Sequence, residues 1–359
     1  MSIRKKEIMF YNAIPMPHSL LLQKKLEEAG YKVNFWYYRN LTDLYPWKEL
    51  NSNVDYYVFT GRFKDFVLLT KHFVKSKLIV VTGFHTIVHI IISFTSVFSR
   101  KKLAIWFDVP EFKEISALNF HKELLKKFFV YTSDYLFVTG KTGCNIFRER
   151  FNIKDSKIVD FPYLGHIFTK EETRTYDGQS QGKVRIFISN RFEARKGYKI
   201  LYEALNVLDQ NIKDKFSIRI AGAGSEFEFY KEKFDQLDSD VLLLGWISYD
   251  EYLYEMKNTD IFIHASLHEP FGIPPIDAMS CGKLLIGSNG VYSCLDRIEN
   301  NKNGFIYDKN DYKRLASILE YVIKNPDLIG KMGYSAYLTS LDYTVDYNIS
   351  AIRDILDKQ

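Results

Sequence analysis

Cysteine is scarce in this chain of 359 residues. The three cysteines, Cys144, Cys281 and Cys294, are odd in number and have no metal-ligand spacing. A disulfide framework or a zinc site is therefore not expected, and a reducing cytoplasm is the natural compartment. The length and the 46% share of hydrophobic residues predict two globular domains with cores of their own.

Glycine is missing where a dinucleotide-binding domain needs it. The segment after the first expected strand, 7–13, contains Pro15 and Pro17, and the first glycine of the chain is Gly30. A G-x-G-x-x-G turn lets the backbone approach a pyrophosphate, so its absence disfavours a nicotinamide or flavin enzyme. A later Gly-Ala-Gly, 222–224, is incomplete and is typical of a tight turn between a strand and a helix.

Acidic residues are few in the first part of the chain. Residues 1–160 contain 25 Lys and Arg against 15 Asp and Glu, whereas the remainder is mildly acidic. The basic residues are scattered and no nucleic-acid-binding module is present, so no nucleic-acid partner is expected. An anionic membrane surface or an anionic lipid-linked substrate fits this charge as well. We expect a cytoplasmic protein, with peripheral attachment to the inner face of the plasma membrane left open.

One uncharged stretch, Leu78–Phe98, is long enough to span a bilayer. It contains Gly83 and two histidines, and it divides into a β-rich run and a helical run. A buried strand and the helix that follows it have the same hydropathy as a membrane span. We therefore interpret this stretch as a strand and a helix.

Short β-rich runs alternate with amphipathic segments along both halves, which predicts two α/β domains with parallel sheets. The polar, aperiodic segment 166–183 is the best linker candidate between domains at 1–165 and 184–340. The tail is predicted to be helical, with 341–359 a candidate for crossing back to the first domain. We therefore expect an α/β fold with two Rossmann-like domains facing across a cleft. Loops at the carboxyl ends of both sheets would form the site.

A basic turn follows the strand expected at 184–190. Arg191 and Lys196 lie in this turn, just before a helix whose N-terminus already favours anions. A planar arginine fork and a compact lysine charge suit a diphosphate. A solvated basic turn is the alternative reading of the same residues.

The segment EPFGIPPIDAMSCG, which begins at Glu269, is the most informative in the chain. Gly272 precedes two prolines that suit the first turn of a helix, and Asp277 lies one to two turns after Glu269. Both carboxylates could therefore face one pocket. Carboxylates accept hydrogen bonds from vicinal hydroxyl pairs, which sugars and ribose display.

This segment resembles the donor-site signature of the retaining family-four glycosyltransferases (glycosyl transferases group 1), which have the two-domain GT-B fold. The family pattern, E-x-F-G-x-x-x-x-E-A-M-x-x-G, is matched except that Asp277 replaces the second glutamate. The turn NRFEARKG, the run LLLGWIS and the stretch NNKNGFIYDKND are also similar to family segments. The N-terminal half is similar only in its layout.

The resemblance implies a role for each matching residue. Arg191 and Lys196 would stabilise the charge on the leaving diphosphate, and Glu269 would contact the hydroxyls of the transferred sugar. Asp277 would bind the ribose. The remaining donor contacts would come from Phe271, Gly272 and Ile273 beside the sugar and phosphate, and from Trp246 and Ile247 beside the base.

The resemblance also implies residues on the acceptor side. His85 lies where the family often has a catalytic histidine near the sugar and the acceptor, although a buried structural histidine is the alternative. Asp108 and Glu111 follow an expected strand and would line the acceptor side. The N-terminal domain would thus bind the acceptor and the C-terminal domain the nucleotide sugar.

We therefore expect a retaining transferase that moves a hexose from a nucleoside diphosphate, UDP rather than GDP, to a hydroxyl of a glycan or lipid-linked acceptor. Polysaccharide or glycolipid assembly is the expected context. No cofactor and no metal ion are expected, since the Asp238-Ser-Asp240 sequence precedes a strand instead of following one. The alternatives are a nucleotide-sugar epimerase on the same scaffold and a non-catalytic partner subunit.

Overall fold

The computed structural model describes residues 6–39, 55–84, 86–108, 120–169, 171–173 and 182–357. Two units are distinguished by their internal contacts. The first comprises 1–164 together with 344–359, and the second comprises 165–343. Each unit contains its own parallel sheet.

The N-terminal unit contains a seven-stranded sheet in the order β3-β2-β1-β4-β5-β6-β7, with every neighbouring pair parallel. Its strands are β1 (Glu7–Asn12), β2 (Lys32–Tyr37), β3 (Tyr57–Val58), β4 (Leu78–Thr82), β5 (Lys102–Phe107), β6 (Tyr135–Val138) and β7 (Ile158–Asp160). The central strands are apolar along their whole length because helices cover both faces. The strand expected at 7–13, and the alternation of β-rich runs with helices in this half, are confirmed.

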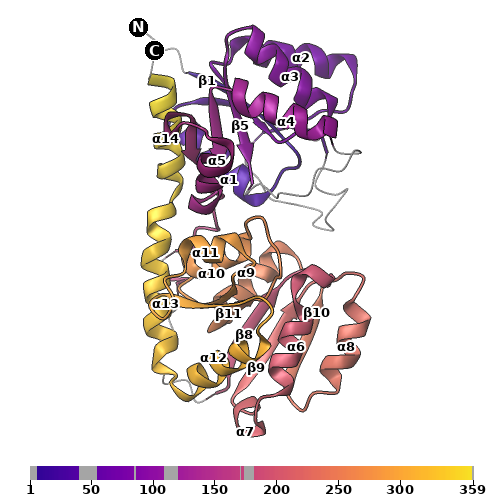
Figure 1. Cartoon of the computed structure of the whole chain (residues 1–359), viewed down its shortest axis with the longest axis vertical. Helices are drawn as coiled ribbons and strands as arrows, with labels where there is room; N and C mark the ends of the chain where they lie inside the picture. Colours follow the sequence, from indigo (N-terminus) through magenta and orange to yellow (C-terminus); the bar gives the residue numbers. More distant parts are fainter. Residues whose placement is uncertain are drawn as a thin grey trace. The chain divides into compact units, whose positions relative to one another are not determined.

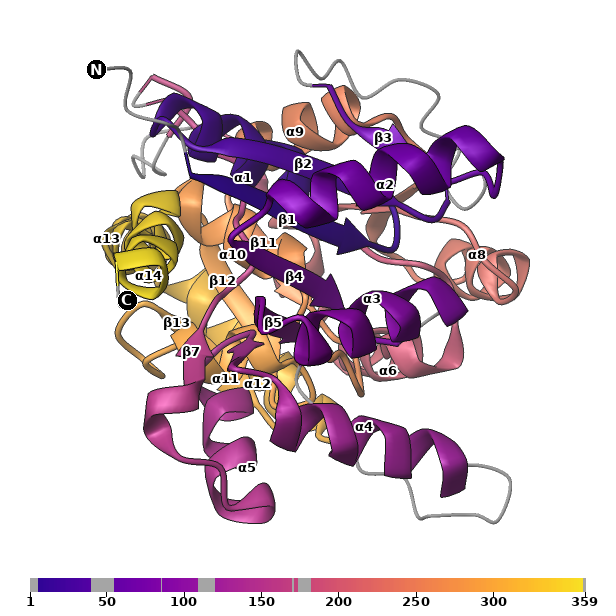
Figure 2. The same ribbon diagram turned by 90° about the horizontal axis from the view of Figure 1, so that it is seen from above.

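Helices are divided between the two faces of this sheet (Figures 1 and 2). One face packs against α1 (Pro17–Glu28) and the C-terminal helix α14 (Val345–Asp357), through residues such as Leu22 and Ile352. The other face packs against α2 (Phe63–Lys75), α3 (Ile87–Phe98), α4 (Phe120–Thr132) and α5 (Lys141–Phe151). A short 3-10 turn, η3 (Asp155–Lys157), precedes β7.

The uncharged stretch Leu78–Phe98 contains β4 and α3, which confirms its interpretation as a strand and a helix. Leu78, Ile79, Val80 and Val81 are buried in the middle of the sheet. Over the described part of the chain, no helix has both the length and the apolar character that a membrane crossing requires.

The C-terminal unit contains a six-stranded parallel sheet in the order β10-β9-β8-β11-β12-β13. Its strands are β8 (Val184–Ser189), β9 (Phe216–Ala221), β10 (Asp240–Gly245), β11 (Ile261–His264), β12 (Leu284–Ser288) and β13 (Gly304–Tyr307). Its helices are η4 (Ala194–Lys196), α6 (Tyr198–Asn206), α7 (Gln210–Lys213), α8 (Phe227–Asp235), α9 (Tyr249–Asn258), α10 (Ile273–Ser280), α11 (Tyr292–Arg297), α12 (Tyr312–Lys324), α13 (Asp327–Ser340) and η5 (Leu341–Tyr343). This is the Rossmann strand order. The edge strand β13 was not expected, because its four residues lie within a polar stretch.

The segment between the two sheets is tied to the second unit. His166 lies in the expected linker 166–183, and its backbone oxygen accepts a hydrogen bond of 3.0 Å from the Ser280 hydroxyl in α10. Helix α14, at the end of the chain, instead supplies Ile349, Ile352 and Ile355 to the core of the first unit. The chain therefore leaves the first unit after Leu164 and returns to it at Thr344.

Candidate functional site

The strand order of the C-terminal sheet reverses between β8 and β11, which lie side by side. The chain leaves these two strands in opposite directions, and ligands of open α/β sheets bind at such a point, beside the carboxyl ends of the strands. The turn after β8 carries Arg191 and Lys196, and the loop after β11 carries Glu269. The fold thus places both predicted charged segments at the switch point of one sheet.

Gly197 allows the turn after β8 to lie directly against the loop after β11. Its φ of +74° is in the left-handed region, and a Cβ atom at this position would lie 1.9 Å from the backbone oxygen of Ala265. Only glycine satisfies both the backbone conformation and the close approach. Lys196, the preceding residue, is thereby fixed beside the β11 loop.

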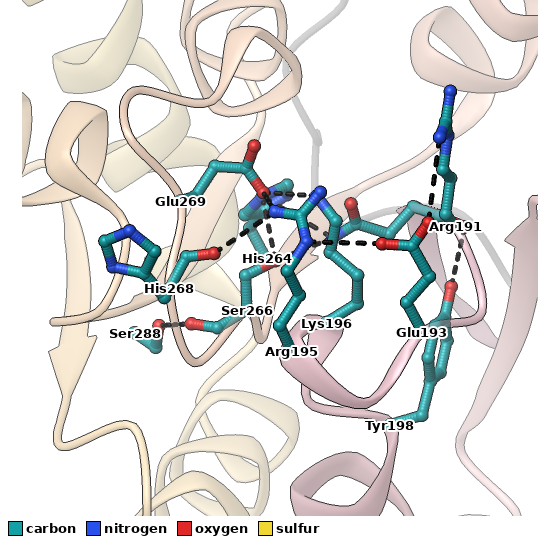
Figure 3. Close-up of polar contacts among 11 residues, drawn as sticks. Arg191, Glu193, Arg195, Lys196, Tyr198, His264, Ser266, His268, Glu269 and Ser288 are labelled. Carbon is teal, nitrogen blue, oxygen red and sulfur yellow. Dashed lines mark hydrogen bonds and ion pairs between the residues drawn. The ribbon is translucent and has the colours of Figure 1, made fainter. Parts of the chain in front are cut away.

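Lys196 and Glu269 form an ion pair in which the lysine Nζ donates to Glu269 Oε2 (Figure 3). Their side chains are 7% and 18% exposed. Burial lowers the pKa of Lys196, while the neighbouring carboxylate opposes that shift. Burial acts to raise the pKa of Glu269, but the charges around it, with that of Lys196 foremost, lower it on balance. The attraction within the pair therefore offsets part of the cost of burying two charges.

Two further arginines extend this pair into a charged cluster (Figure 3). Arg195 lies 3.6 Å from Glu269 and 3.2 Å from Glu193, measured between nitrogen and carboxylate oxygen. Glu193 in turn lies 3.6 Å from Arg191. Three cations and two carboxylates give the cluster a net positive charge. Such a cluster can accept an anionic group without burying an unpaired charge.

The loop that carries Glu269 is fixed through the end of β12. The backbone N–H of Glu269 donates to Gly290 O at 2.8 Å. The Ser288 hydroxyl donates to Ser266 O and accepts from the Gly290 N–H, so it joins the two loops. Glu269 is therefore held by a backbone bond and a buried serine, and not by its ion pair alone.

A buried polar group lies next to the pair, at the end of β11. His264 Nε2 is 3.4 Å from the hydroxyl of Ser266, and the Asn190 side chain donates to that hydroxyl at 3.0 Å. Burial lowers the pKa of His264 to about 4, so this imidazole is neutral at physiological pH. It adds no charge beside Lys196.

The remaining predicted donor-binding residues lie on neighbouring loops of the same unit. Phe271 is buried, Gly272 has a φ of +95°, and Ile273 is the first residue of α10. Trp246 is exposed after β10, while Ile247 packs against a cluster that includes Tyr252 and Met279. Strand β10 is at the edge of the sheet, two strands from β8.

Asp277 is only 3% exposed. Its Oδ1 accepts a hydrogen bond from the His166 backbone N–H at 2.6 Å, and its Oδ2 accepts one from the Tyr252 hydroxyl at 2.7 Å. Burial raises the pKa of Asp277 to about 6, against the lowering effect of these two bonds. The residue predicted to bind ribose thus has both carboxylate oxygens engaged by its own unit.

We expect the Asp277→Asn substitution to change the pH dependence of stability. Between pH 4 and 6 the folded protein retains a proton on Asp277 that the unfolded chain has lost, so the free energy of unfolding falls as pH rises through 6. Asparagine does not titrate. The stability of the variant relative to the parent should therefore increase by about 2–3 kcal/mol from pH 4 to pH 7. Urea unfolding at the two pH values measures this difference.

Asp250→Asn, on the exposed surface of α9, is the matched control and should show no such trend. An equal pH dependence in the Asp277→Asn variant and the parent would contradict the raised pKa.

The residues predicted to lie on the acceptor side belong to the N-terminal unit. His85 and Glu111 lie outside the described residues. Asp108 is exposed after β5 and accepts a hydrogen bond of 2.6 Å from the Tyr163 hydroxyl. In the described ranges, no three His, Cys, Asp or Glu side chains are grouped as potential ligands of a metal ion.

Several residues of the site were not identified from the sequence. Arg195 and Glu193 lie in the basic turn itself, so their charge was a usable signal. There was no such signal in the sequence for Tyr252, His166 or Ser288, because each of them acts through a partner that is distant in the sequence. The partners of Asp277, for example, are 25 and 111 residues away.

Parts of this chain are similar to known proteins. Residues 169–339 match the family described as Glycosyl transferases group 1. An uncharacterized glycosyltransferase of Haemophilus influenzae is 22% identical over 63% of this chain and 62% of its own length. The alpha-1,3/1,6-mannosyltransferase ALG2 of Dictyostelium discoideum is 23% identical over 59% of this chain and 57% of its own. The chain thus spans little more than half the length of these curated relatives.

Among solved structures, Alr3699/HepE of Anabaena in complex with UDP superposes with a TM-score of 0.74. It is 16% identical and covers 97% of this chain and 99% of its own. The same protein has also been solved with UDP-glucose. The predicted GT-B fold, with its two Rossmann-like parallel-sheet domains, is confirmed. The chain has the GT-B fold, and its C-terminal unit is similar to glycosyl transferases group 1.

Proposed function

We propose that this protein is a glycosyltransferase that uses a nucleoside diphosphate sugar as donor. The observation that carries the proposal is the Lys196–Glu269 pair, buried at the switch point of the C-terminal sheet and flanked by Arg195 and Arg191. Cations at such a place match the charge of a diphosphate leaving group. Glu269 provides an acceptor for sugar hydroxyls beside them.

The positive charges contribute most where negative charge develops. As the bond between sugar and diphosphate breaks, charge accumulates on the phosphate oxygens, and preorganised cations stabilise that state more than the ground state. Lys196, Arg195 and Arg191 would supply this stabilisation from the protein itself. We therefore propose a reaction that does not depend on a metal ion.

A hexose donor carried on UDP is the specific form of this proposal. The Anabaena protein with UDP-glucose and the Dictyostelium mannosyltransferase both support a hexose, and the first supports uracil over guanine. A glycan or lipid-linked acceptor, in polysaccharide or glycolipid assembly, is proposed from the resemblance and the basic N-terminal half.

We propose retention of the anomeric configuration, by a front-face route in which the departing phosphate takes the proton of the acceptor hydroxyl. No covalent sugar–enzyme intermediate is then required of Glu269. Proton NMR of the glycoside product, which does not mutarotate, reports its anomeric configuration, and an inverted product would refute retention.

A thermal-shift screen in the presence of EDTA tests donor binding and metal independence together. UDP and UDP-hexoses should raise the melting temperature in a concentration-dependent manner, and GDP should do so less. A ligand at 100 times its Kd stabilises the folded state by about 2.7 kcal/mol. Failure of every nucleoside diphosphate to stabilise the protein would contradict the proposed function. Stabilisation that appears only after Mg²⁺ or Mn²⁺ is added would contradict metal independence.

A further inference from the structure

Three neighbouring helices of the N-terminal unit have apolar side chains on the side that faces away from their sheet. Helices α2, α3 and α4 pack on the same face of the sheet, through Leu69, Ile92 and Val130 (Figures 1 and 2). Of the 22 large hydrophobic side chains that are exposed in the described structure, ten lie on these three helices. This concentration is much higher than their share of the chain.

The stripe on α3 is the clearest. Ile87, Ile91 and Phe98 are exposed, and Phe94 lies between the last two at intermediate burial. Intervals of three to four residues place all four on one side of the helix. The opposite side, with His89, Ile92 and Ser96, is buried. Helix α3 has no charged residue, so it is apolar on its outer side and packed on its inner side.

Aromatic contacts connect this stripe to α4. The ring centroid of Phe94 is 5.2 Å from that of Phe128, and Leu124 and Tyr131 are exposed one turn before and after Phe128. Helix α2 likewise has exposed apolar residues on one side, and these are spaced three, four or seven residues apart. We call the whole set the outer apolar face: Phe63, Phe66, Val67, Val74, Ile87, Ile91, Phe94, Phe98, Leu124, Phe128 and Tyr131.

The exposed charges on these helices are positive. Lys64, Lys71 and Lys75 are exposed on α2, and Lys127 is exposed on α4. The acidic residue of α2, Asp65, is buried and accepts hydrogen bonds from the backbone and hydroxyl of Thr60. Arg100 directly follows α3. The outer apolar face is therefore accompanied by lysine and arginine.

We propose that the outer apolar face docks the protein on the surface of an anionic lipid bilayer. Exposed aromatic and aliphatic side chains can enter the boundary between headgroups and acyl chains, while adjacent lysines contact anionic headgroups. A water-exposed apolar surface of this extent is unusual for a protein without a partner. The positive charge favours an anionic membrane over a second copy of the same face, which would bring like charges together.

Flotation of the full-length protein with vesicles tests this proposal. Vesicles of phosphatidylcholine with about 30% phosphatidylglycerol should bind the protein, whereas phosphatidylcholine alone should bind it much less, since each basic residue near an anionic surface contributes roughly fivefold to binding. Raising the salt from 0.1 M to 1 M should weaken the charge component, as the Debye length falls from about 10 Å to about 3 Å.

Two sets of variants separate the apolar from the charged contribution. Phe63→Ser, Ile87→Ser and Phe98→Ser combined should lower partition to anionic vesicles at least about tenfold, because these exposed side chains provide the apolar area that enters the membrane. Lys64→Glu, Lys71→Glu and Lys127→Glu combined should abolish the preference for anionic lipid.

The matched controls lie on the C-terminal unit. They are Val207→Ser, Phe229→Ser and Tyr254→Ser for the first set, and Lys231→Glu, Lys313→Glu and Lys331→Glu for the second. Neither control set should change binding.

Circular dichroism confirms that each variant is folded. Absence of binding to anionic vesicles, or equal binding by the serine variant and its control, would overturn the proposal. Light scattering provides a second test. A dimer of the parent protein that dissociates in the serine variant would identify the outer apolar face as a self-association surface instead.

Discussion

Replacing Lys196 by alanine should lower kcat by about 100-fold or more, the effect of removing one preorganised group that stabilises developing negative charge. Lys196 is buried beside Glu269 and is the least exposed cation of the cluster. Its charge therefore acts in a low-dielectric environment, where it would have the greatest effect on the proposed leaving diphosphate. Arg191→Ala should lower kcat in the same direction. Steady-state rates with a UDP-hexose at saturating donor concentration measure both.

The exposed Lys199 on α6, three residues away, is the matched control, and Lys199→Ala should leave kcat unchanged. Loss of Lys196 also leaves Glu269 as a buried carboxylate without its main partner, which reduces stability. The assay is therefore run at a temperature at which circular dichroism shows the variant folded. Near-normal turnover of folded Lys196→Ala and Arg191→Ala variants would remove the diphosphate assignment.

Gly197→Ala should destabilise the C-terminal unit by about 3 kcal/mol or more. A Cβ atom in the left-handed conformation costs roughly 1–2 kcal/mol, and overpacking against fixed backbone adds roughly 1–3 kcal/mol. Both costs apply, because the added methyl group would lie 1.9 Å from Ala265 O at a φ of +74°. Denaturant unfolding measures the change.

Gly245 separates the two contributions. Its φ is +66°, but no atom lies within 4 Å of the position that a Cβ would occupy. Gly245→Ala should therefore incur only the conformational cost, about 1–2 kcal/mol. Equal losses of stability in the two variants would contradict the close approach of Gly197 to Ala265.

The strands were the most predictable part of the fold. Runs such as those at 78–83 and 184–190 are β-branched, apolar and bounded by turn residues, so local sequence was sufficient to identify them. Strand β13 was missed because four residues in a polar stretch produce no periodic signal. The side of the sheet on which each helix packs depends on contacts between distant residues, which a single sequence does not display.

The candidate site, like the fold, could be predicted from the sequence only in part. Lys196 and Glu269 were expected to act on one ligand, and the structure brings them into direct contact because β8 and β11 are neighbours. The surroundings of Asp277 could not be foreseen. Gly165 lies close to its carboxylate, since a Cβ on that glycine would be 3.0 Å from Asp277 Oδ1, and His166 and Tyr252 bind its oxygens. The sequence shows an aspartate at position 277, but it does not show which residues surround the carboxylate.

The three cysteines have a practical consequence for experiments on motion. Cys144, Cys281 and Cys294 are all buried and none is in a disulfide. Burial raises the pKa of Cys281 to about 12 and raises that of Cys294 further, so neither is a reactive thiolate at neutral pH. The native protein should therefore react only slowly with maleimides. A single cysteine introduced on the surface of either unit would then be labelled selectively with a fluorophore, without removing a native residue. Slow labelling of the unmodified chain would report how often its two cores open.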